Sequence, residues 1–361
     1  MTAIDPEFNL QSYDFELPEA QIAQDPTEKR GASRLLVLDR ASGGIRDAMF
    51  ADLPDLLPPG ALLVVNNTKV LPARLIGLKG SGGRVEFLLL TPLALIEAGT
   101  GPDGTFAAVA EGLLKASKGP RPGDILHFDG LELRVLEKGE FGRARVEMRW
   151  KGDLAGHFLD QGHIPLPPYI HREDKREDRT RYQTVYSRED KLGSVAAPTA
   201  GLHFTPQIMN ALESRGIGLA EVTLYVGYGT FSPVRCEDIR DHVMHAEYAE
   251  VSVETAQAIS LAKAEGRPVV AVGTTTSRTL ESMATALGEI GPFKGWTDIF
   301  IRPGYRFKVV DQLVTNFHLP RSSLIIMVST LAGRQQIIDA YNHAIRQGFR
   351  FFSYGDAMLI R

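Results

Sequence analysis

The chain has 361 residues, of which 43% are hydrophobic and 23% are charged, and its formal net charge is −4. This balance is typical of a globular protein of one large or two ordinary domains, and it argues against a protein that coats nucleic acid through a general positive excess. Cys236 is the only cysteine, so an intrachain disulfide is excluded. The sequence shows neither a membrane span nor a secretion signal, and we expect a cytoplasmic protein.

Residues 1–74 are expected to form the first part of an α/β main domain. Two short apolar runs, 34–39 and 61–65, are bounded by Gly, Pro and Asn, which favours buried strands, with a helix or turn between them. Residues 75–152 differ, because apolar residues partly alternate in short segments separated by Gly, Pro and Asp turns. This pattern predicts an inserted small all-β domain, barrel-like. Its expected strands are 84–90, 105–111, 124–128, 131–138 and 143–150.

Residues 153–361 alternate helical and strand-like segments and are expected to be the second part of the main α/β domain, carrying most of the active site. The charged tract 171–181 mixes both signs and predicts a mobile, solvated loop. Helices are predicted over 206–216, 254–266, 274–287, 322–333 and 334–348. Strands are predicted over 219–226, 268–272, 296–301 and 349–355.

Four segments of this second part combine small residues, hydroxyls and imidazoles. They are 193–205, 226–234, 272–282 and 315–323. Such segments contribute little to a hydrophobic core, and their backbone can approach another molecule closely. They predict a binding site assembled from the C-terminal half.

Two of these segments have glycine or hydroxyl patterns that suggest anion binding. Gly227, Gly229 and Thr230 follow a strand, but no helix begins there and a third glycine is absent, so a tight turn is the alternative to a nucleotide loop. In 272–282 a strand ends, Gly273 makes a turn, and hydroxyls stand where a helix N-terminus exposes free N–H groups. This arrangement suits a carboxylate or phosphate, and simple capping is the alternative.

The histidines are candidates for proton transfer or metal binding. His203 and His318 each lie in a polar loop, where an imidazole can exchange protons near neutral pH or serve only as a hydrogen-bonding linker. His242 and His245 are spaced to approach each other on a helix, near Glu247. No third soft ligand or HExxH pattern accompanies them, and we predict no metal site.

Basic residues gather in three places despite the acidic total. Lys115, Lys118 and Arg121 recur at three-residue intervals, and two other groups contain aromatic residues. Each group is either a solvated loop or a contact for the phosphates of RNA. The other two groups are Arg302, Arg306 and Lys308 around Tyr305, and Arg346 and Arg350 beside Phe349, Phe351 and Phe352.

Segments along nearly the whole chain resemble the S-adenosylmethionine:tRNA ribosyltransferase-isomerase family of queuosine biosynthesis. Residues 91–150 match least, with only the basic, glycine- and proline-containing LKASKGPRPGD similar to the family. The matching stretches include YDFELP, SRLLVLDR, VVNNTKVLPARL, HIPLPPYI, RYQTVYS, GSVAAPTAGLHFT, VTLYVGYGTFSPVR, HVMHAEY, VGTTTSRTLES, WTDIFIRPGYRFKVVDQLVTNFHLP and FRFFSYGDAML.

This resemblance implies transfer and isomerisation of the ribosyl group of S-adenosylmethionine onto 7-aminomethyl-7-deazaguanine at the wobble position of tRNA. Epoxyqueuosine-tRNA forms, and adenine and methionine leave. S-adenosylmethionine is then a co-substrate, with no permanently bound cofactor and no obligate protein partner, and a monomer is expected. A base must remove a proton from the ribose C5′ beside the sulfonium, which stabilises the carbanion.

Candidate roles follow from residue type under this reading. The base is His203 or His318, with Asp298 and Glu281 as alternatives, and Phe352, Tyr354 and Asp356 are candidates to close the pocket. Lys115, Lys118, Arg121, Arg302 and Arg306 are candidate RNA contacts. Binding of the co-substrate is expected from Thr199, Gly201, Tyr228, Gly229, Thr230, Phe231, Thr274, Thr275 and Arg278.

Two rival functions compete with this one. An S-adenosylmethionine-dependent RNA methyltransferase is disfavoured because no glycine-rich loop follows the first strand. A noncatalytic RNA-binding protein is disfavoured because the net charge is low and because hydroxyl, imidazole and carboxylate groups concentrate in loops.

Overall fold

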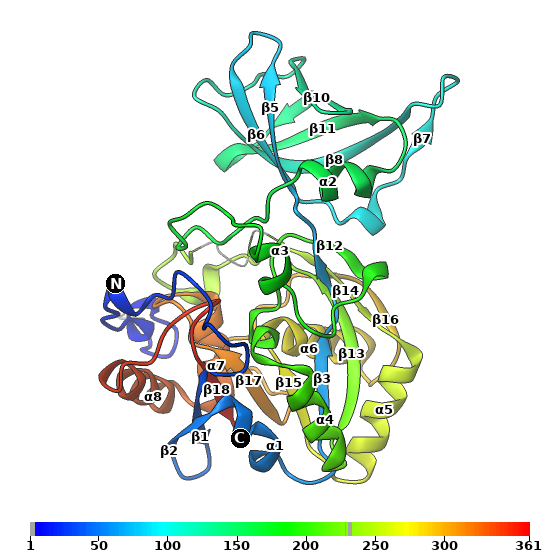
Figure 1. Cartoon of the computed structure of the whole chain (residues 1–361). Coiled ribbons are helices and arrows are strands. Elements are labelled where there is room, and N and C mark those ends of the chain that lie inside the picture. Colours follow the sequence, from blue (N-terminus) through cyan, green and yellow to red (C-terminus); the bar gives the residue numbers. More distant parts are fainter. Residues whose placement is uncertain (1–3, 228, 230–232) are drawn as a thin grey trace.

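The computed structural model describes residues 4–227, 229 and 233–361. These residues form an α/β main domain and a β-barrel domain joined by a narrow connection (Figure 1). The chain enters the barrel after the third strand of the main domain and returns to complete the main sheet. The predicted fold class, an α/β domain with an inserted barrel-like unit, is confirmed.

The main domain is built on a nine-stranded sheet in the order β16-β14-β13-β3-β15-β17-β18-β1-β2. Its four central strands, β13, β3, β15 and β17, are mutually parallel, so their carboxyl ends meet at one edge. The bounds are β1 (Arg34–Asp39), β2 (Gly44–Met49), β3 (Leu62–Asn66), β13 (Gly218–Tyr225), β14 (Glu247–Val251), β15 (Val269–Val272), β16 (Phe293–Thr297), β17 (Gln312–Asn316) and β18 (Ala357–Ile360).

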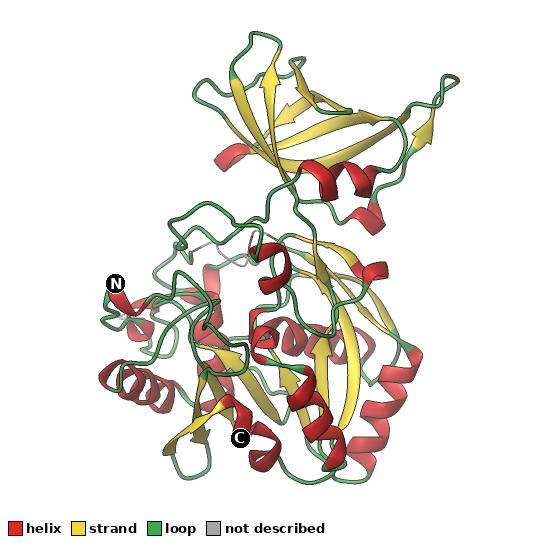
Figure 2. Cartoon of the chain, in the orientation of Figure 1, coloured by secondary structure: helices red, strands yellow, loops and turns green. Residues whose placement is uncertain are grey.

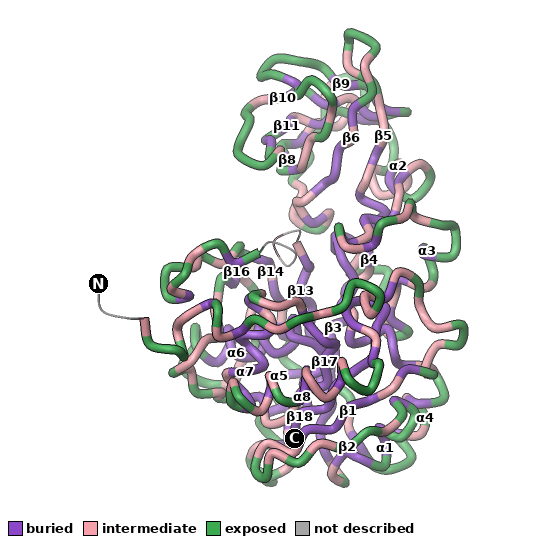
Figure 3. The backbone as a smooth tube through the Cα atoms, turned by 90° about the vertical axis from the view of Figure 1, so that its left-hand side faces the viewer, coloured by how far each residue is buried: buried purple, intermediate pink, exposed green. Residues whose placement is uncertain are grey.

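Both faces of this sheet are buried, which explains why its central strands are continuously apolar (Figure 3). Leu62 and Val64 of β3 pack with α5 to α8, whereas Leu63 and Val65 pack on the opposite face with α1 and α4. The helices are α1 (Leu53–Leu56), α2 (Leu154–Gln161), α3 (Asp178–Arg181), α4 (Pro206–Ser214), α5 (Val253–Ala264), α6 (Thr274–Leu287), α7 (Ser323–Ala332) and α8 (Arg334–Arg346).

Six antiparallel strands close the barrel, because β11 pairs with both β10 and β8 (Figure 2). Phe87, Leu126 and Met148 fill its interior, and the two-stranded pair β4 (Lys69–Val70) and β12 (Leu192–Ser194) lies outside it. The barrel strands are β5 (Arg74–Lys79), β6 (Arg84–Leu89), β8 (Phe106–Lys115), β9 (Ile125–Phe128), β10 (Leu131–Lys138) and β11 (Arg143–Trp150), with β7 (Gly99–Thr100) at an edge of β8.

The turn between β10 and β11 has an unusual residue in a left-handed conformation. Phe141 has φ 54° and Gly142 has φ 83°, and the Arg143 N–H donates to the Glu140 carbonyl. Two successive positive φ angles define a type I′ turn, where Gly, Asn and Asp are preferred. A side chain with a Cβ costs roughly 1–2 kcal/mol in this conformation. Phe141 is nevertheless 75% exposed, so burial does not offset that cost.

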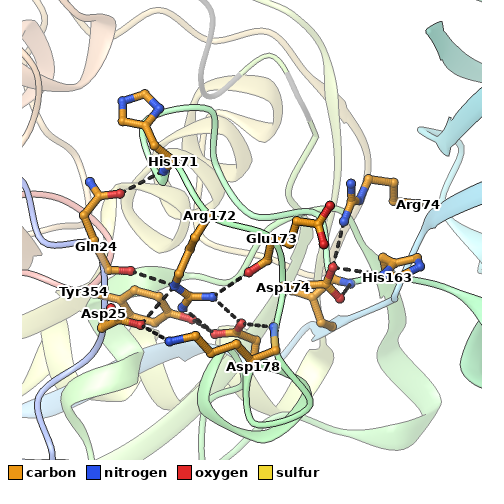
Figure 4. A network of polar contacts seen from close by, with 12 residues as sticks. Gln24, Asp25, Arg74, His163, His171, Arg172, Glu173, Asp174, Asp178 and Tyr354 are labelled. Carbon is orange, nitrogen blue, oxygen red and sulfur yellow. Dashed lines mark hydrogen bonds and ion pairs between the residues drawn. The ribbon is translucent and has the colours of Figure 1, made fainter. Parts of the chain in front are cut away.

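The two chain segments that connect the domains are held together by Asp174 (Figure 4). Arg74, at the start of β5, donates to Asp174 over 2.7 Å, and His163 Nδ1 lies 3.0 Å from the same carboxylate. The backbones of Arg74 and His163 also form a β-bridge. One carboxylate therefore ties together the segment that enters the barrel and the segment that leaves it.

The prediction of a mobile, solvated loop over 171–181 is confirmed only in part: residues 171–177 form a largely exposed loop, but residues 178–181 form α3. The mobility of the loop stays a prediction. Arg172 makes a two-bond ion pair with Asp178, whose side chain is also an acceptor for the Tyr354 hydroxyl (Figure 4). Asp178 is buried, and burial alone would raise its pKa. The hydrogen bonds that its carboxylate accepts outweigh burial, so the pKa lies below the ordinary value. Some of the charges in this tract, such as those of Arg172 and Lys175, are therefore paired within the tract or with Asp25 of the main domain, and others are exposed.

Two strand predictions near the C-terminal end also need correction. The strand predicted at 296–301 begins and ends earlier, at 293–297. Residues 349–355 do not form a strand, because Phe352 adopts φ 71° and the Gly355 N–H closes a turn on its carbonyl. Phe349 and Phe351 fill the core beside Phe317 and Tyr341, and the strand that follows is β18.

The expectation that His242 and His245 lie on a helix is wrong. These residues form an extended approach to β14, and His242 packs edge-on against Phe300. Within residues 4–227, 229 and 233–361, no group of three His, Cys, Asp or Glu residues could hold a metal ion. In the same part of the chain, no helix is both long and apolar enough to cross a membrane.

Candidate active site

A cavity of about 360 Å³ lies at the carboxyl ends of the central strands. Val226 follows β13, Gly273 follows β15, Asn316 ends β17, and all three line the cavity. In open α/β sheets this edge is where ligands bind, because loops diverge there and leave space. Three of the four predicted segments contribute several lining residues each. The fourth, 226–234, contributes Val226 and Pro233, and its residues 228 and 230–232 lie outside those described.

The N-terminus of α6 forms one wall. Gly273 has φ 87°, a conformation that L side chains rarely adopt, and it turns the chain from β15 directly into the helix. Thr274 and Thr275 then stand at the cavity, whereas the Thr276 hydroxyl donates back to the Val272 carbonyl. The first N–H groups of a helix lack partners within the helix, so this wall suits an anion.

The segment between β17 and α7 forms a second wall and contains His318. Its Nε2 lies 2.8 Å from Thr315 Oγ1, and its backbone N–H donates to the Tyr341 hydroxyl. Burial lowers the pKa of His318 to about 3, so the imidazole is uncharged at neutral pH. His318 is the only predicted base candidate found among the cavity-lining residues described by the structure.

His203 lies behind the wall rather than in it. Its Nδ1 is 2.8 Å from Ser33 Oγ, and its Nε2 is 3.1 Å from Asn316 Nδ2. Because an amide nitrogen can only donate, Nε2 accepts and the Nδ1–H donates to Ser33. Burial lowers the pKa of His203 to about 3 as well, which fits an uncharged orienting group. Asn316, the residue that His203 orients, lines the cavity.

Aromatic residues from two distant segments form a third wall. Tyr169 and Phe352 stack with ring centroids 4.5 Å apart, and the Tyr169 hydroxyl is hydrogen-bonded to Ser353. Thr199 also lines the cavity, from the short 3₁₀ turn Thr199–His203. Gly201 of that turn does not line the cavity. It packs closely against Tyr186, and a Cβ at this position would lie 2.1 Å from the Tyr186 hydroxyl oxygen.

Three charged candidates occupy places other than the cavity wall. Arg278 forms a buried ion pair with Glu247, which also accepts the Gly227 N–H. Asp298 is exposed just after β16. Glu281 is buried and accepts the Tyr305 hydroxyl and the N–H groups of residues 308–310. Tyr228, Thr230 and Phe231 lie outside the described residues, and Gly229 packs against His245.

Comparison with known proteins now identifies the family. The family model described as queuosine biosynthesis protein matches residues 10–360. The chain belongs to the queuosine biosynthesis family. The resemblance stated from the sequence motifs is therefore confirmed.

The relatives within this family are similar over almost their whole lengths. Proteins named S-adenosylmethionine:tRNA ribosyltransferase-isomerase from Oleidesulfovibrio alaskensis and Nitratidesulfovibrio vulgaris strain DP4 are 63% and 62% identical. The matches cover 99% and 98% of this chain and 94% and 98% of those proteins. A crystal structure titled S-adenosylmethionine tRNA ribosyltransferase from Thermotoga maritima is 34% identical, covers 97% of this chain and 100% of its own, and has a TM-score of 0.54. Membership makes the chain a transferase.

The predicted RNA contacts of this family member lie on both domains. Lys115, at the end of β8, is exposed and lines a second cavity of about 420 Å³ between the barrel and the residues 164–174. Lys118 and Arg121 are exposed in the following loop of the barrel. Arg302 and Arg306 belong to the main domain, where Arg302 is partly buried and Arg306 exposed. Their role in RNA binding remains a prediction.

Sequence reasoning selected the segment of Asn316 but not the residue itself. Asn316 Nδ2 donates to the Phe352 carbonyl over 3.0 Å, and its Oδ1 has no hydrogen-bond partner among the described residues. A buried carbonyl oxygen without a partner is costly and uncommon in native proteins. The available signal was an amide side chain near the start of the segment 315–323, next to the Pro-bounded loop that contains His318.

Proposed function

We propose that this chain transfers and isomerises the ribosyl group of S-adenosylmethionine onto 7-aminomethyl-7-deazaguanine at the wobble position of tRNA. The products are epoxyqueuosine-tRNA, adenine and methionine. The observation that carries the proposal is the convergence of the small-residue segments on one cavity at the carboxyl ends of β13, β15 and β17. Family membership supports the same reaction class.

The methionine part of the co-substrate is expected at the start of α6. Free N–H groups of Thr274 and Thr275 offer a carboxylate two donors and the positive end of the helix dipole. Phe317, Phe352 and Leu319 make much of the remaining wall apolar. Exclusion of water from such a pocket strengthens the dipoles that stabilise developing charge.

His318 is the proposed base. If Nε2–H donates to Thr315 Oγ1, the lone pair of Nδ1 is left to take the proton from the ribose C5′. The C5′–H bond breaks, its electron pair stays on carbon beside the sulfonium, and the imidazole becomes an imidazolium. A carboxylate bound nearby favours that charged form and so raises the pKa of His318 from its value of about 3.

The test is product identification. The purified protein is incubated with S-adenosylmethionine and tRNA carrying 7-aminomethyl-7-deazaguanine, and tRNA with unmodified guanine serves as the control. Adenine and methionine should appear together and only with the modified tRNA. S-adenosylhomocysteine as the product would replace the proposal with methyl transfer, and tight tRNA binding without turnover would replace it with a binding module.

A further inference from the structure

An exposed aromatic ring stands where the barrel faces the main domain, in a turn that disfavours its residue type. Phe141 occupies the left-handed position of the type I′ turn between β10 and β11, at φ 54°, and is 75% exposed. Gly, Asn or Asp would suit this turn better, and an exposed ring adds nothing to a core. Unfavourable backbone conformations of this kind concentrate at functional sites.

The ring is held from one side by the other domain. The guanidinium carbon of Arg235 lies 4.3 Å from the ring centroid, and Arg143 Nη2 lies 3.0 Å from His245 Nδ1 in a neighbouring contact. Arg235 and His245 belong to the main domain, so both contacts link it to the barrel turn. Arginine stacked on an aromatic ring orients the ring and leaves its second face for another planar group.

The ring also lines the second cavity, which adjoins the candidate active site. Phe141 shares this cavity of about 420 Å³ with Lys115 and Arg172. Pro168 lines both this cavity and the one of about 360 Å³. A strand of RNA with one nucleotide in the active-site cavity would therefore have its neighbouring nucleotides close to Phe141 and its phosphates close to Lys115.

We propose that Phe141, backed by Arg235, stacks an unpaired nucleobase of the RNA substrate next to the nucleotide that is modified. The inference rests on the proposed function only in requiring that tRNA is bound. Unpaired bases are recognised by stacking on aromatic rings and on guanidinium planes, and every base has a face that can stack. The cavity that Phe141 lines combines apolar side chains such as Leu114 and Ile170 with the cations Lys115 and Arg172, and this combination suits a base joined to phosphates better than a wholly apolar protein partner.

The turn allows an experiment in which binding and stability change in opposite directions. Phe141→Asn places a residue favoured in a type I′ turn, so the thermal midpoint should stay equal or rise. Affinity for an unmodified tRNA transcript should nevertheless fall roughly tenfold or more, as loss of one stacked base predicts. Phe141→Trp should retain affinity. Val109→Ala, which removes another exposed apolar side chain of the barrel, is the matched control and should bind tRNA like the unaltered chain.

Salt dependence separates stacking from charge. Phe141→Asn should leave the slope of log affinity against log salt unchanged, whereas Lys115→Ala should reduce it by about one. Unchanged tRNA affinity of Phe141→Asn would overturn the inference, and so would an equal loss of S-adenosylmethionine affinity, which would indicate general damage. If the unaltered chain binds tRNA but makes no adenine and methionine, the proposed function fails while this inference is still tested.

Discussion

His203 and His318 have the same side chain, similar burial and the same lowered pKa, yet they differ in what they touch. His318 lines the cavity beside Thr315, whereas His203 is enclosed between Ser33 and Asn316. The first can reach a bound molecule. The second can act on that molecule only by orienting Asn316.

This difference predicts unequal effects of substitution on turnover. His318→Ala should lower kcat by about a hundredfold or more, the usual contribution of a general base. His203→Gln should lower it less than about tenfold, because the amide can donate to Ser33 and accept from Asn316. Single-turnover release of adenine measures both. The roles would be reversed if His203→Gln abolished adenine release while His318→Ala did not.

The buried imidazoles also predict how stability depends on pH. The folded pKa of His203 is about 3 against an ordinary value of 6.5, so between these values the unfolded chain binds a proton that the folded chain does not. The free energy of unfolding should therefore rise with pH up to about 6.5 and then become flat. His203→Gln should reduce the slope near pH 5 by about 1.4 kcal/mol per pH unit. Urea titrations at several pH values measure this, and an unchanged slope would contradict it.

Residue type alone did not distinguish candidates that line the cavity from candidates whose side chains only stabilise the fold. Thr274 and Thr275 directly follow a predicted strand and its turn, and His318 lies in a predicted polar loop, so local sequence placed all three at the site. Arg278 and Glu281 carry equally suitable groups on the same helix. Their partners, Glu247 and the backbone of 308–310, are distant in sequence, and tertiary pairing of this kind cannot be read from a local motif.

Among the secondary-structure elements, α6 is attached to the loop before β17 through the buried side chain of Glu281. That carboxylate accepts hydrogen bonds from the Tyr305 hydroxyl and three successive N–H groups, and so fixes the loop before β17 to the helix. Glu281→Gln should lower the free energy of unfolding by about 3 kcal/mol, because an amide cannot accept all of these bonds and hydrogen bonds to a charged group are the stronger ones.

Glu289→Gln is the control for Glu281→Gln, since Glu289 is an exposed residue just beyond the end of the same helix. Denaturation of both variants should show the loss only for Glu281→Gln. Equal stability of the two variants would show that the loop is held by other contacts. A loss of turnover without a loss of stability would instead return Glu281 to the list of candidate bases.

Elements with a clear period or a β-branched composition were predicted well. The strand at 34–39 and the helix at 274–287 have the predicted bounds. The strand predicted at 349–355 was wrong because a run of buried aromatic residues is equally compatible with a strand and with a turn. Phe352 also adopts a positive φ, a backbone conformation that its residue type disfavours. β14 was missed because its histidine-rich approach suggested a helix by spacing alone.

At the scale of the whole molecule, the connection between domains depends on few side chains. Asp174→Ala should free Arg74 from that partner and remove the contact with His163, so the barrel should move more relative to the main domain. We expect faster proteolysis within residues 162–176 and a larger radius of gyration in solution scattering, with the barrel still folded. Asp160→Ala, at an exposed position of α2, is the control. Identical proteolysis of both variants would contradict this role of Asp174.

The domain boundaries at residues 74 and 152 remain a prediction that this variant would help to test. The composition change from apolar runs to alternating strands could be read from the sequence, because each domain uses a different strand period. The relative placement of the domains could not, since it depends on contacts between residues far apart in sequence, such as Arg74 with Asp174.

The pairing of β1 with β18 has a consequence for how the protein is made. The barrel strands find all their partners between residues 74 and 150, so this unit can fold while translation continues. β1, in contrast, is bordered by β2 and β18, and β18 leaves the ribosome only after every other strand of the sheet. β3 waits only for β13 and β15, whereas one edge of β1 must stay unpaired until the end of synthesis. A nascent chain stalled before residue 357 would expose that edge of β1 to aggregation or to chaperones.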